Sequence, residues 1–163
     1  MKTILVLASL LLSSLAFAQR AGGNEMNFNL GFASGAVALG ASYEHNYENY
    51  GLGGYVYIQT KKDKASVYQT TTFGGDFKVH LVPHTRFDAY IAPGFGIAML
   101  SDYPVSGKTD DKTIIGPSMK IGAQYRLNNR MKIGVERLLI TNWFEDAVSK
   151  SFEFTSVVFG FDF

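Results

Sequence analysis

Apolar and polar residues alternate along eight segments of the chain. In the first segment, for example, Phe28 and Leu30 alternate with Asn29. Because successive side chains of a β-strand point to opposite faces, this period of two predicts strands with one apolar and one polar face. The predicted strands cover residues 26–32, 37–44, 52–59, 73–81, 87–99, 118–126, 131–136 and 156–163.

The connections between these segments fall into two groups. The tight ones are 45–49, 82–85 and 127–130, and the longer polar ones are 60–70, 100–113 and 141–151. Only the first connection, Ser34-Gly35, departs from this alternation of lengths. Short turns on one rim and longer loops on the other are typical of a membrane barrel whose termini lie on the short-turn, periplasmic side. The pattern therefore predicts an all-β, eight-stranded antiparallel up-and-down transmembrane β-barrel.

Facing residues of an antiparallel pair share a face, which constrains each tight turn. A three-residue loop, 128–130, is required to set Arg126 opposite Lys132. A four-residue turn at 46–49 would set Gly40 opposite Tyr55, leaving room for the phenol ring over bare backbone.

Side-chain volume indicates which face is outside. A soluble lipocalin-like barrel would turn its apolar face inward and carry a charged outer face, whereas a membrane barrel turns its apolar face outward. Here the apolar face carries large side chains, while the polar face is sparsely charged and rich in glycine. These glycines are Gly31, Gly40, Gly53, Gly74, Gly94, Gly96, Gly122, Gly134 and Gly160. Because only a narrow lumen demands such small residues, we expect the apolar face to contact lipid.

The N-terminus has the organisation of a secretory signal peptide. Lys2 precedes an apolar run that closes with Ala16, Phe17 and Ala18, an A-x-A cleavage signal. We therefore expect residues 1–18 to be removed and residues 19–163 to form one barrel domain.

Composition limits the possible functions. The chain is 47% hydrophobic and 18% charged, with no cysteine and a formal net charge of +1. The absence of cysteine excludes disulfides, thiolate metal sites and cysteine nucleophiles. Without a basic patch, nothing in the sequence indicates binding to nucleic acid.

The C-terminal residues carry a family resemblance. Phe159, Phe161 and Phe163 alternate up to the last residue, as in the assembly signal of bacterial outer-membrane proteins. With the signal peptide and the eight segments, the mature chain resembles the small outer-membrane β-barrel superfamily of the OmpA transmembrane domain, OmpX and OmpW. The resemblance implies recognition by the barrel assembly machinery, a location in the outer membrane among phospholipid and lipopolysaccharide, and extracellular long loops. We expect a monomer.

Charged residues on the inward parity form a candidate polar network in the lumen. They are Glu44, Asp76, Lys78, His80, Asp88, Lys120, Arg126, Lys132, Glu136 and Asp162. Acids and bases are nearly balanced, so these residues form either a salt-bridge network that plugs a narrow bore or a polar path for small solutes. The plug is the preferred interpretation.

One feature raises the possibility of catalysis. A turn centred on His84 would place His80 across from Asp88, and lipid A-modifying enzymes exist on eight-stranded barrels. No serine lies beside His80 in this register, so we interpret the pair as a structural hydrogen bond. The three histidines lack metal-ligand spacing, and we predict no enzyme activity, no cofactor and no metal.

Three residues depart from the ideal pattern. Pro93 and Pro117 fall within predicted strands, where each removes a backbone donor, so we expect bulges or strand ends near them. Arg137 has the lipid-facing parity, and we expect it near the outer rim or after a bulge.

Aromatic and basic residues near the strand ends indicate where the bilayer surfaces lie. An aromatic girdle is expected at the short-turn rim, formed by Tyr43, Phe87, Tyr125 and Phe163. Trp143 and Phe144 could belong to the opposite girdle or contact a partner. The basic loop formed by Lys61, Lys62 and Lys64 could face lipopolysaccharide phosphates or be a solvated tip.

Three functions remain open. The preferred one is a structural or surface-interaction barrel with a plugged lumen. The second is a narrow, OmpW-like conduit for small or apolar molecules, and the third is a lipid A-modifying enzyme.

Overall fold

The computed structural model describes residues 23–33, 36–47, 50–62, 66–81, 86–104, 110–144 and 151–163. The predicted signal peptide and its cleavage site at Ala16 and Ala18 lie outside these ranges. The strands are β1 (Asn24–Ala33), β2 (Ala36–Tyr47), β3 (Tyr50–Lys62), β4 (Ser66–His80), β5 (Phe87–Pro104), β6 (Asp110–Arg126), β7 (Met131–Thr141) and β8 (Ser151–Asp162). In the described part of the chain, no helix is long and apolar enough to span a bilayer.

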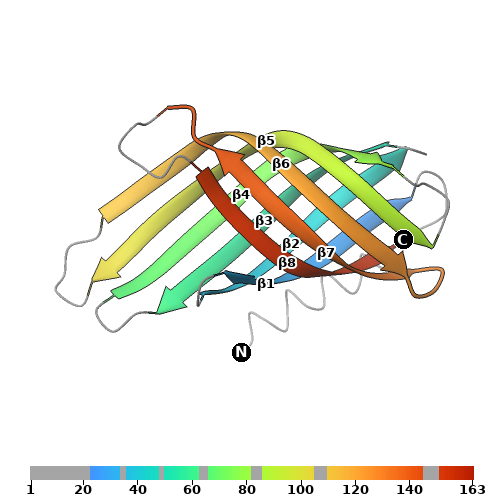
Figure 1. Ribbon diagram of the computed structural model, residues 1–163, viewed down its shortest axis with the longest axis horizontal. Coiled ribbons are helices and arrows are strands. Elements are labelled where there is room, and N and C mark those ends of the chain that lie inside the picture. The colour runs from blue at the N-terminus through green and yellow to red at the C-terminus, as the bar shows by residue number, and fades with distance from the viewer. Residues whose placement is uncertain are drawn as a thin grey trace.

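The strands form one closed barrel in which each strand pairs antiparallel with its neighbours in sequence (Figure 1). The first and last strands close the cylinder, with Glu25 opposite Asp162 and Gly31 opposite Ser156. Closure leaves no unpaired sheet edge, which is the requirement for a β-structure in lipid. The predicted eight-stranded up-and-down barrel is confirmed.

The two faces of the strands follow the predicted alternation. On β7, for example, Ile133 and Val135 are exposed on the outside, whereas Lys132 and Glu136 are buried in the bore. Every strand exposes apolar side chains in the same way. One outward residue from each strand in turn is Phe28, Leu39, Val56, Phe77, Phe95, Ile121, Val135 and Phe159.

The strands extend further than the alternation indicates, and the predicted long loops are correspondingly too long. The connections at that rim span residues 63–65, 105–109 and 142–150 rather than 60–70, 100–113 and 141–151. Backbone pairing continues from Thr60 to Lys62 against β4 although the side chains there no longer alternate. Beyond the apolar band of the barrel, neither face of a strand has to carry apolar side chains. Paired residues there therefore show no alternation of apolar and polar residues in the sequence.

One of the predicted tight turns is confirmed and another is wrong. Arg126 lies opposite Lys132, and the Leu127 amide donates to the Met131 carbonyl oxygen at 2.9 Å, which leaves a three-residue loop. Between β2 and β3, however, pairing continues to Tyr47 and Tyr50. Their rings stack on the outer face with centroids 5.1 Å apart, and this contact extends the ladder by two residues.

The longer ladder shifts the β2–β3 register by two residues. Gly40 therefore faces Tyr57, not Tyr55 as predicted. The same kind of shift occurs between β4 and β5, where His80 faces Tyr90 rather than Asp88. A shift of two leaves every side chain on its predicted face, because the strand period is two.

Pro93 and Pro117 interrupt hydrogen bonding without producing bulges. The β4–β5 ladder breaks beside Pro93 and resumes in the same register at Val79 and Ile91. The β6–β7 ladder ends at Ser118, immediately after Pro117. Because proline has no backbone N–H, each ladder lacks a donor at that position. The β4–β5 ladder has a gap there, and the β6–β7 ladder ends. The expected bulge or strand end is therefore wrong for both prolines, because β5 and β6 continue through them, although Pro117 does mark the end of the β6–β7 ladder.

Candidate functional site

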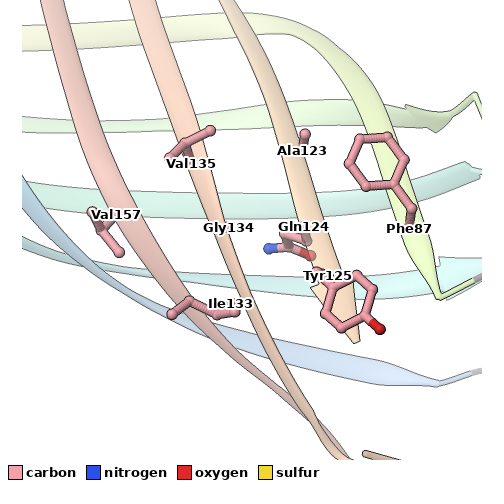
Figure 2. A pocket seen from close by; sticks show the side chains of 8 residues that line it. All are labelled: Phe87, Ala123, Gln124, Tyr125, Ile133, Gly134, Val135 and Val157. Atoms are coloured by element: carbon pink, nitrogen blue, oxygen red, sulfur yellow. The ribbon is translucent and has the colours of Figure 1, made fainter. Parts of the chain in front are cut away.

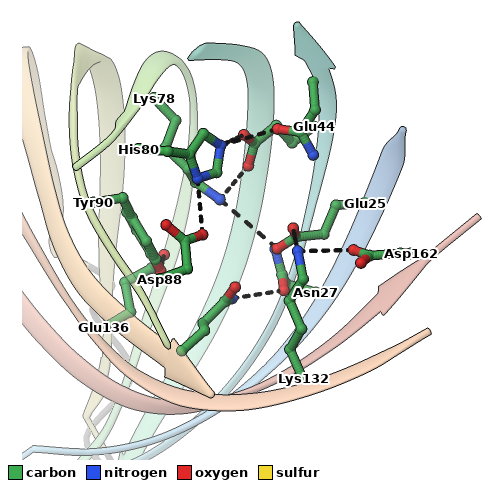
Figure 3. Close-up of polar contacts among 12 residues, drawn as sticks. Glu25, Asn27, Glu44, Lys78, His80, Asp88, Tyr90, Lys132, Glu136 and Asp162 are labelled. Atoms are coloured by element: carbon green, nitrogen blue, oxygen red, sulfur yellow. Dashed lines mark hydrogen bonds and ion pairs between the residues drawn. The ribbon is translucent and has the colours of Figure 1, made fainter. Parts of the chain in front are cut away.

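The bore near the short-turn rim contains a network of charged side chains contributed by seven of the eight strands. Figure 3 shows the part of it around Glu25 and His80. The structure buries Glu44, Asp76, Lys78, Lys120, Lys132 and Glu136, and partly buries His80, Asp88 and Asp162. Arg126 lies at the mouth, with 44% of its side chain exposed. All ten residues thus lie on the inner face, although they divide into separate groups of contacts.

Glu25 occupies the centre of this network, and the sequence analysis missed it. Its side chain is fully buried, contacts the Lys132 ammonium directly and has its Oε1 3.8 Å from Lys78 Nζ. The signal was available, because Glu25 shares the inward parity of Asn27 and Asn29. The alternation becomes visible only at Met26, so the predicted first strand begins one residue after Glu25.

From Glu25 the ion pairs continue in two directions. Toward the rim, Lys132 Nζ lies 2.8 Å from Asp162, which also accepts from Arg126 at 3.2 Å. Across the bore, Lys78 contacts Glu44 directly. These contacts link strands on opposite sides of the cylinder. Each buried charge of this group, namely Glu25, Glu44, Lys78 and Lys132, therefore has an opposite charge beside it, as the low dielectric of such a site requires.

His80 belongs to the same group. Its Nε2 lies 3.0 Å from Glu44 Oε1 and 3.1 Å from Asn46 Oδ1, and its Nδ1 lies 2.8 Å from Asp88 Oδ2. Asp88 is a diagonal neighbour across the β4–β5 ladder, so the predicted contact forms despite the shifted register. No serine is within hydrogen-bonding distance of His80 among the described residues. The arrangement lacks the nucleophile of an acyl hydrolase.

Glu136 is the centre of a second group, held mainly by hydroxyl and amide donors. Tyr57 donates to its Oε1 at 2.7 Å, Tyr90 donates to its Oε2 at 2.8 Å and Asn29 Nδ2 donates at 3.2 Å. Asn29 also bonds Ser156 at 3.0 Å. Both carboxylate oxygens are thus bonded, which offsets the desolvation of a fully buried charge.

A third contact joins Lys120 to Asp76 at 2.6 Å. Two of the buried lysines also lie over aromatic rings, with Lys78 Nζ 4.3 Å from the centre of Tyr90 and Lys120 Nζ 4.9 Å from that of Tyr55. Cation–π contacts of this kind stabilise ammonium groups that have lost water. Among the described residues, no group of three or more potential ligands is arranged to hold a metal ion.

Toward the opposite rim the bore is apolar. Tyr57 packs against Phe154 with ring centroids 4.9 Å apart, and Tyr55 lies 5.3 Å from Tyr57. The cluster comprises Ala38, Tyr55, Tyr57, Ala98, Ile114, Leu138, Ile140, Phe152 and Phe154, and we refer to it as the apolar plug. The expectation that charged residues fill the bore is therefore correct only for its short-turn half, whereas the expected small residues are found in the apolar half too, with Gly31 against Phe154 and Gly96 against Tyr55.

The C-terminal residues close the barrel. The backbones of Asn24 and Phe163 exchange hydrogen bonds of 3.1 and 2.9 Å, so pairing continues to the last residue. The ring of Phe163 packs against that of Tyr43 at 6.4 Å, and the Tyr43 hydroxyl donates to Asn24 Oδ1 at 2.9 Å. Phe159 and Phe161 take the same outward parity along β8. The three residues of the predicted assembly signal thus lie on the outer side of the closing strand.

The outer face carries aromatic residues at both rims. Tyr43, Phe87 and Tyr125 are exposed near the short turns, as expected for a girdle. At the other rim, Trp143 is 64% exposed and meets the ring of Phe95 edge-on at 6.1 Å. This contact with an outward strand residue favours the girdle interpretation for Trp143.

Arg137 lies on the outer face, where its guanidinium contacts Glu153. Its backbone faces Ile121 on one side and Thr155 on the other in unbroken register, so no bulge precedes it. On the outer face of β7, Val135 precedes Arg137 and Leu139 follows it, so the charged pair interrupts an apolar stretch of this strand. Of the predicted basic loop, Lys61 is exposed, while Lys64 and the Lys62 side chain lie outside the described residues.

Neither a family model nor a curated protein sequence matches the chain. Solved structures do match it along most of its length. The N-terminal barrel domain of Pseudomonas aeruginosa OprF superposes with a TM-score of 0.68 at 12% identity, covering 89% of this chain and 100% of that one. P. aeruginosa OprG gives 0.63 at 11% identity, covering 90% and 98%.

The Yersinia pestis attachment invasion locus protein Ail gives a TM-score of 0.62 at 8% identity, covering 88% of this chain and 100% of that one. That structure is a complex with the heparin analogue sucrose octasulfate. At these identities the likeness concerns the fold. It confirms that the chain has the fold of small outer-membrane β-barrels, as the C-terminal phenylalanines and the strand pattern indicate.

Proposed function

We propose that the chain is an integral protein of the bacterial outer membrane, with its short turns and both termini in the periplasm and its longer loops outside the cell. The observation that carries this proposal is the continuous outward display of large apolar side chains on all eight strands. A soluble protein would not expose such a surface, since isolated apolar patches are normally small. In a bilayer the same apolar surface contacts hydrocarbon. The closed barrel also satisfies its own backbone polar groups, which lipid cannot do.

The barrel acts as a structural or surface-interaction protein with a closed bore and without enzymatic activity. Two layers in series support closure. The ionic half pairs Lys78, Lys120 and Lys132 with buried carboxylates, and the apolar plug packs Tyr57 against Phe154 above it. The loops between β5 and β6 and between β7 and β8 would then provide the surface for extracellular partners.

Membrane insertion is tested by site-directed spin labelling. The chain has no cysteine, so single cysteines report one position each. Labels at Phe77 and Ile121, both exposed on the outer face, should be relaxed by oxygen and protected from a water-soluble nickel chelate. A label at Asn128 in the short turn should show the opposite behaviour. Equal access of the nickel chelate to Ile121 and Asn128 would refute insertion.

The closed bore is tested by planar-bilayer recording of the purified barrel. We expect no steady single-channel openings. Such openings would reject the plug and favour the alternative, a narrow conduit for small or apolar molecules. The remaining alternative, a lipid A-modifying enzyme, requires loss of an acyl chain from radiolabelled lipid A in a reaction that depends on His80.

The outer face of the barrel supports two partner proposals. The barrel assembly machinery would read Phe159, Phe161 and Phe163 before Phe163 is fixed against Asn24 and Tyr43. Deleting Phe163 should lower the amount of membrane-inserted protein in cells more than it lowers refolding in detergent. After insertion, lipopolysaccharide would surround the loop-side half of the outer face and phospholipid the short-turn half.

A further inference from the structure

A pair of opposite charges lies on the outer face of the barrel, where β7 and β8 run side by side. The Arg137 guanidinium contacts the Glu153 carboxylate, and the two side chains are 63% and 51% exposed. Arg137 has the outward parity of Val135 and Leu139 on its own strand, and it faces Ile121 on β6. Apolar side chains therefore surround the arginine along β7 and on the side of β6.

The depth of Arg137 in a bilayer follows from its place on the strand. β7 begins at Met131, beside the short turn, and Arg137 is the sixth residue after it. At about 3.3 Å per residue and a strand tilt of about 40°, its backbone lies about 15 Å from that rim, whereas the apolar band of such barrels is about 25 Å tall. Trp143, which meets Phe95 at the loop rim, lies six residues further along the chain. The arginine thus starts inside the apolar band, where lipid offers a charge no hydrogen bonds.

The outer face is hollowed next to this pair (Figure 2). The hollow has a volume of about 370 Å³. Val135 and Val157, which face each other across β7 and β8, line it, and Arg137 and Thr155 form the next outward pair of the same ladder. Two convex cylinders touch only along a narrow line. A hollow beside a polar contact lets side chains of one cylinder interlock with those of another.

The charges indicate what covers this surface. An arginine alone would attract the phosphate of a lipid, but Glu153 neutralises Arg137 and would repel a phosphate. A pair without net charge fits a partner that presents the same two charges in the opposite order. A second copy of this chain presents them, because a two-fold axis along the membrane normal brings Arg137 of each copy beside Glu153 of the other at the same depth.

We propose that the barrel forms a two-fold symmetric dimer through the outer face of β7 and β8. Arg137 and Glu153 of the two copies form one cluster of four charges, and the two barrels cover it from lipid. Charged side chains inside a membrane pair with one another and face protein, and they are rarely exposed to hydrocarbon. The dimer differs from the monomer expected from the sequence. It rests on the proposed membrane location, because in water the same pair would be an ordinary exposed ion pair.

Double electron–electron resonance between single spin labels in phospholipid bilayers tests this dimer. A label at Asn129, in the short turn between β6 and β7, lies beside the proposed contact, whereas a label at Lys61 lies on β3, on the opposite side of the barrel. We expect the Asn129 labels to give a defined distance between copies, shorter than that between Lys61 labels. Their modulation depth should stay unchanged when the lipid is increased tenfold. A modulation depth that falls in proportion to dilution would show chance proximity and overturn the proposal.

Charge reversal separates a contact between copies from a contact within one copy. Arg137→Glu gives a surface with two acids and Glu153→Arg one with two bases, so each variant alone should lose the modulation of the Asn129 label. Mixing the two variants in equal amounts should restore it, because acidic surfaces then meet basic ones. A role within one barrel predicts no recovery on mixing. The matched control is Arg126→Glu, which reverses an exposed charge paired with Asp162 at the mouth of the bore and should leave the dimer intact.

The outcomes also distinguish the dimer from the proposed membrane location. If a label at Phe77 is open to the water-soluble nickel chelate, the barrel is not inserted and the proposed function fails. If Phe77 is protected but the Asn129 labels give no defined distance, the barrel is inserted as a monomer and the dimer is wrong. If each reversed variant dimerises as well as wild type, Arg137 and Glu153 are not the contact. Heat-dependent gel mobility checks that every variant is folded.

Discussion

The ring of Tyr57 lies directly over Gly40, its partner across the β2–β3 ladder. A Cβ atom at Gly40 would come within 2.0 Å of Tyr57 Cδ1. The ring cannot move aside freely, because its hydroxyl donates to Glu136 and its face packs against Phe154. The pair therefore joins the wall of the barrel to the boundary between the ionic network and the apolar plug.

Gly40→Ala should destabilise the barrel by about 1–3 kcal/mol, the usual cost of overpacking a closely packed interior. Unfolding by urea in detergent micelles measures this change. Gly23→Ala is the matched control, since a Cβ at Gly23 meets nothing within 4 Å. Tyr57→Ala in the Gly40→Ala background should remove the clash, so the two substitutions together should cost less than the sum of their separate effects. Strict additivity would contradict the contact.

Lys78 is the buried cation on which two carboxylates depend. Lys78→Met removes the ammonium group that Glu44 contacts and that lies near Glu25, so the two carboxylates face each other. We expect the free energy of unfolding to fall by about 3–5 kcal/mol. Lys61→Met, at an exposed position, should change it by less than about 0.5 kcal/mol. Adding Glu44→Gln to Lys78→Met should recover part of the loss, because it removes one of the two carboxylate charges that Lys78 offsets. A Lys78→Met barrel as stable as wild type would contradict the ionic network.

Glu136 depends on two phenol donors at once. Tyr57→Phe and Tyr90→Phe each remove one hydrogen bond to a charged group, so each should cost about 1.5–3 kcal/mol. The double variant should cost more than the sum, since Asn29 is then the carboxylate's remaining hydrogen-bond donor among the described residues. Tyr125→Phe, on the outer face, controls for loss of a hydroxyl. Equal costs for Tyr57→Phe and Tyr125→Phe would refute the role of the buried bond.

Alternation predicted the fold and the inward face of the ten candidate network residues, although not of Glu25, which lies just before the first alternating segment. It could not predict register, because a shift of two residues leaves both faces unchanged. This is why Gly40 was matched with Tyr55 instead of Tyr57. Parity was sufficient for the turn at 128–130, where Arg126 and Lys132 share a face and a three-residue loop sets them opposite each other.

The apolar plug was not predicted because several of its strands are apolar on both faces, and because β8 reverses the alternation there, with Phe152 and Phe154 inward and Glu153 and Thr155 outward. On β7 the buried Leu138 and Ile140 alternate with the partly buried Leu139, so no polar residue marks the inner face. Continuous apolar runs give no period. The plug also takes residues from strands far apart in sequence, such as Tyr57 and Phe154, and only the closed barrel brings them together.

Two closures in series make a specific prediction for conductance. Phe154→Ala opens the apolar plug but leaves the ionic half intact. Lys78→Ala disrupts the ionic half but leaves the apolar plug intact. We expect each single variant to remain silent in planar bilayers and the double variant to show brief openings, since ions then meet neither barrier. Heat-dependent gel mobility checks that all three variants are folded. Openings of Phe154→Ala as frequent as those of the double variant would show that the apolar plug alone closes the bore and that the ionic half admits water.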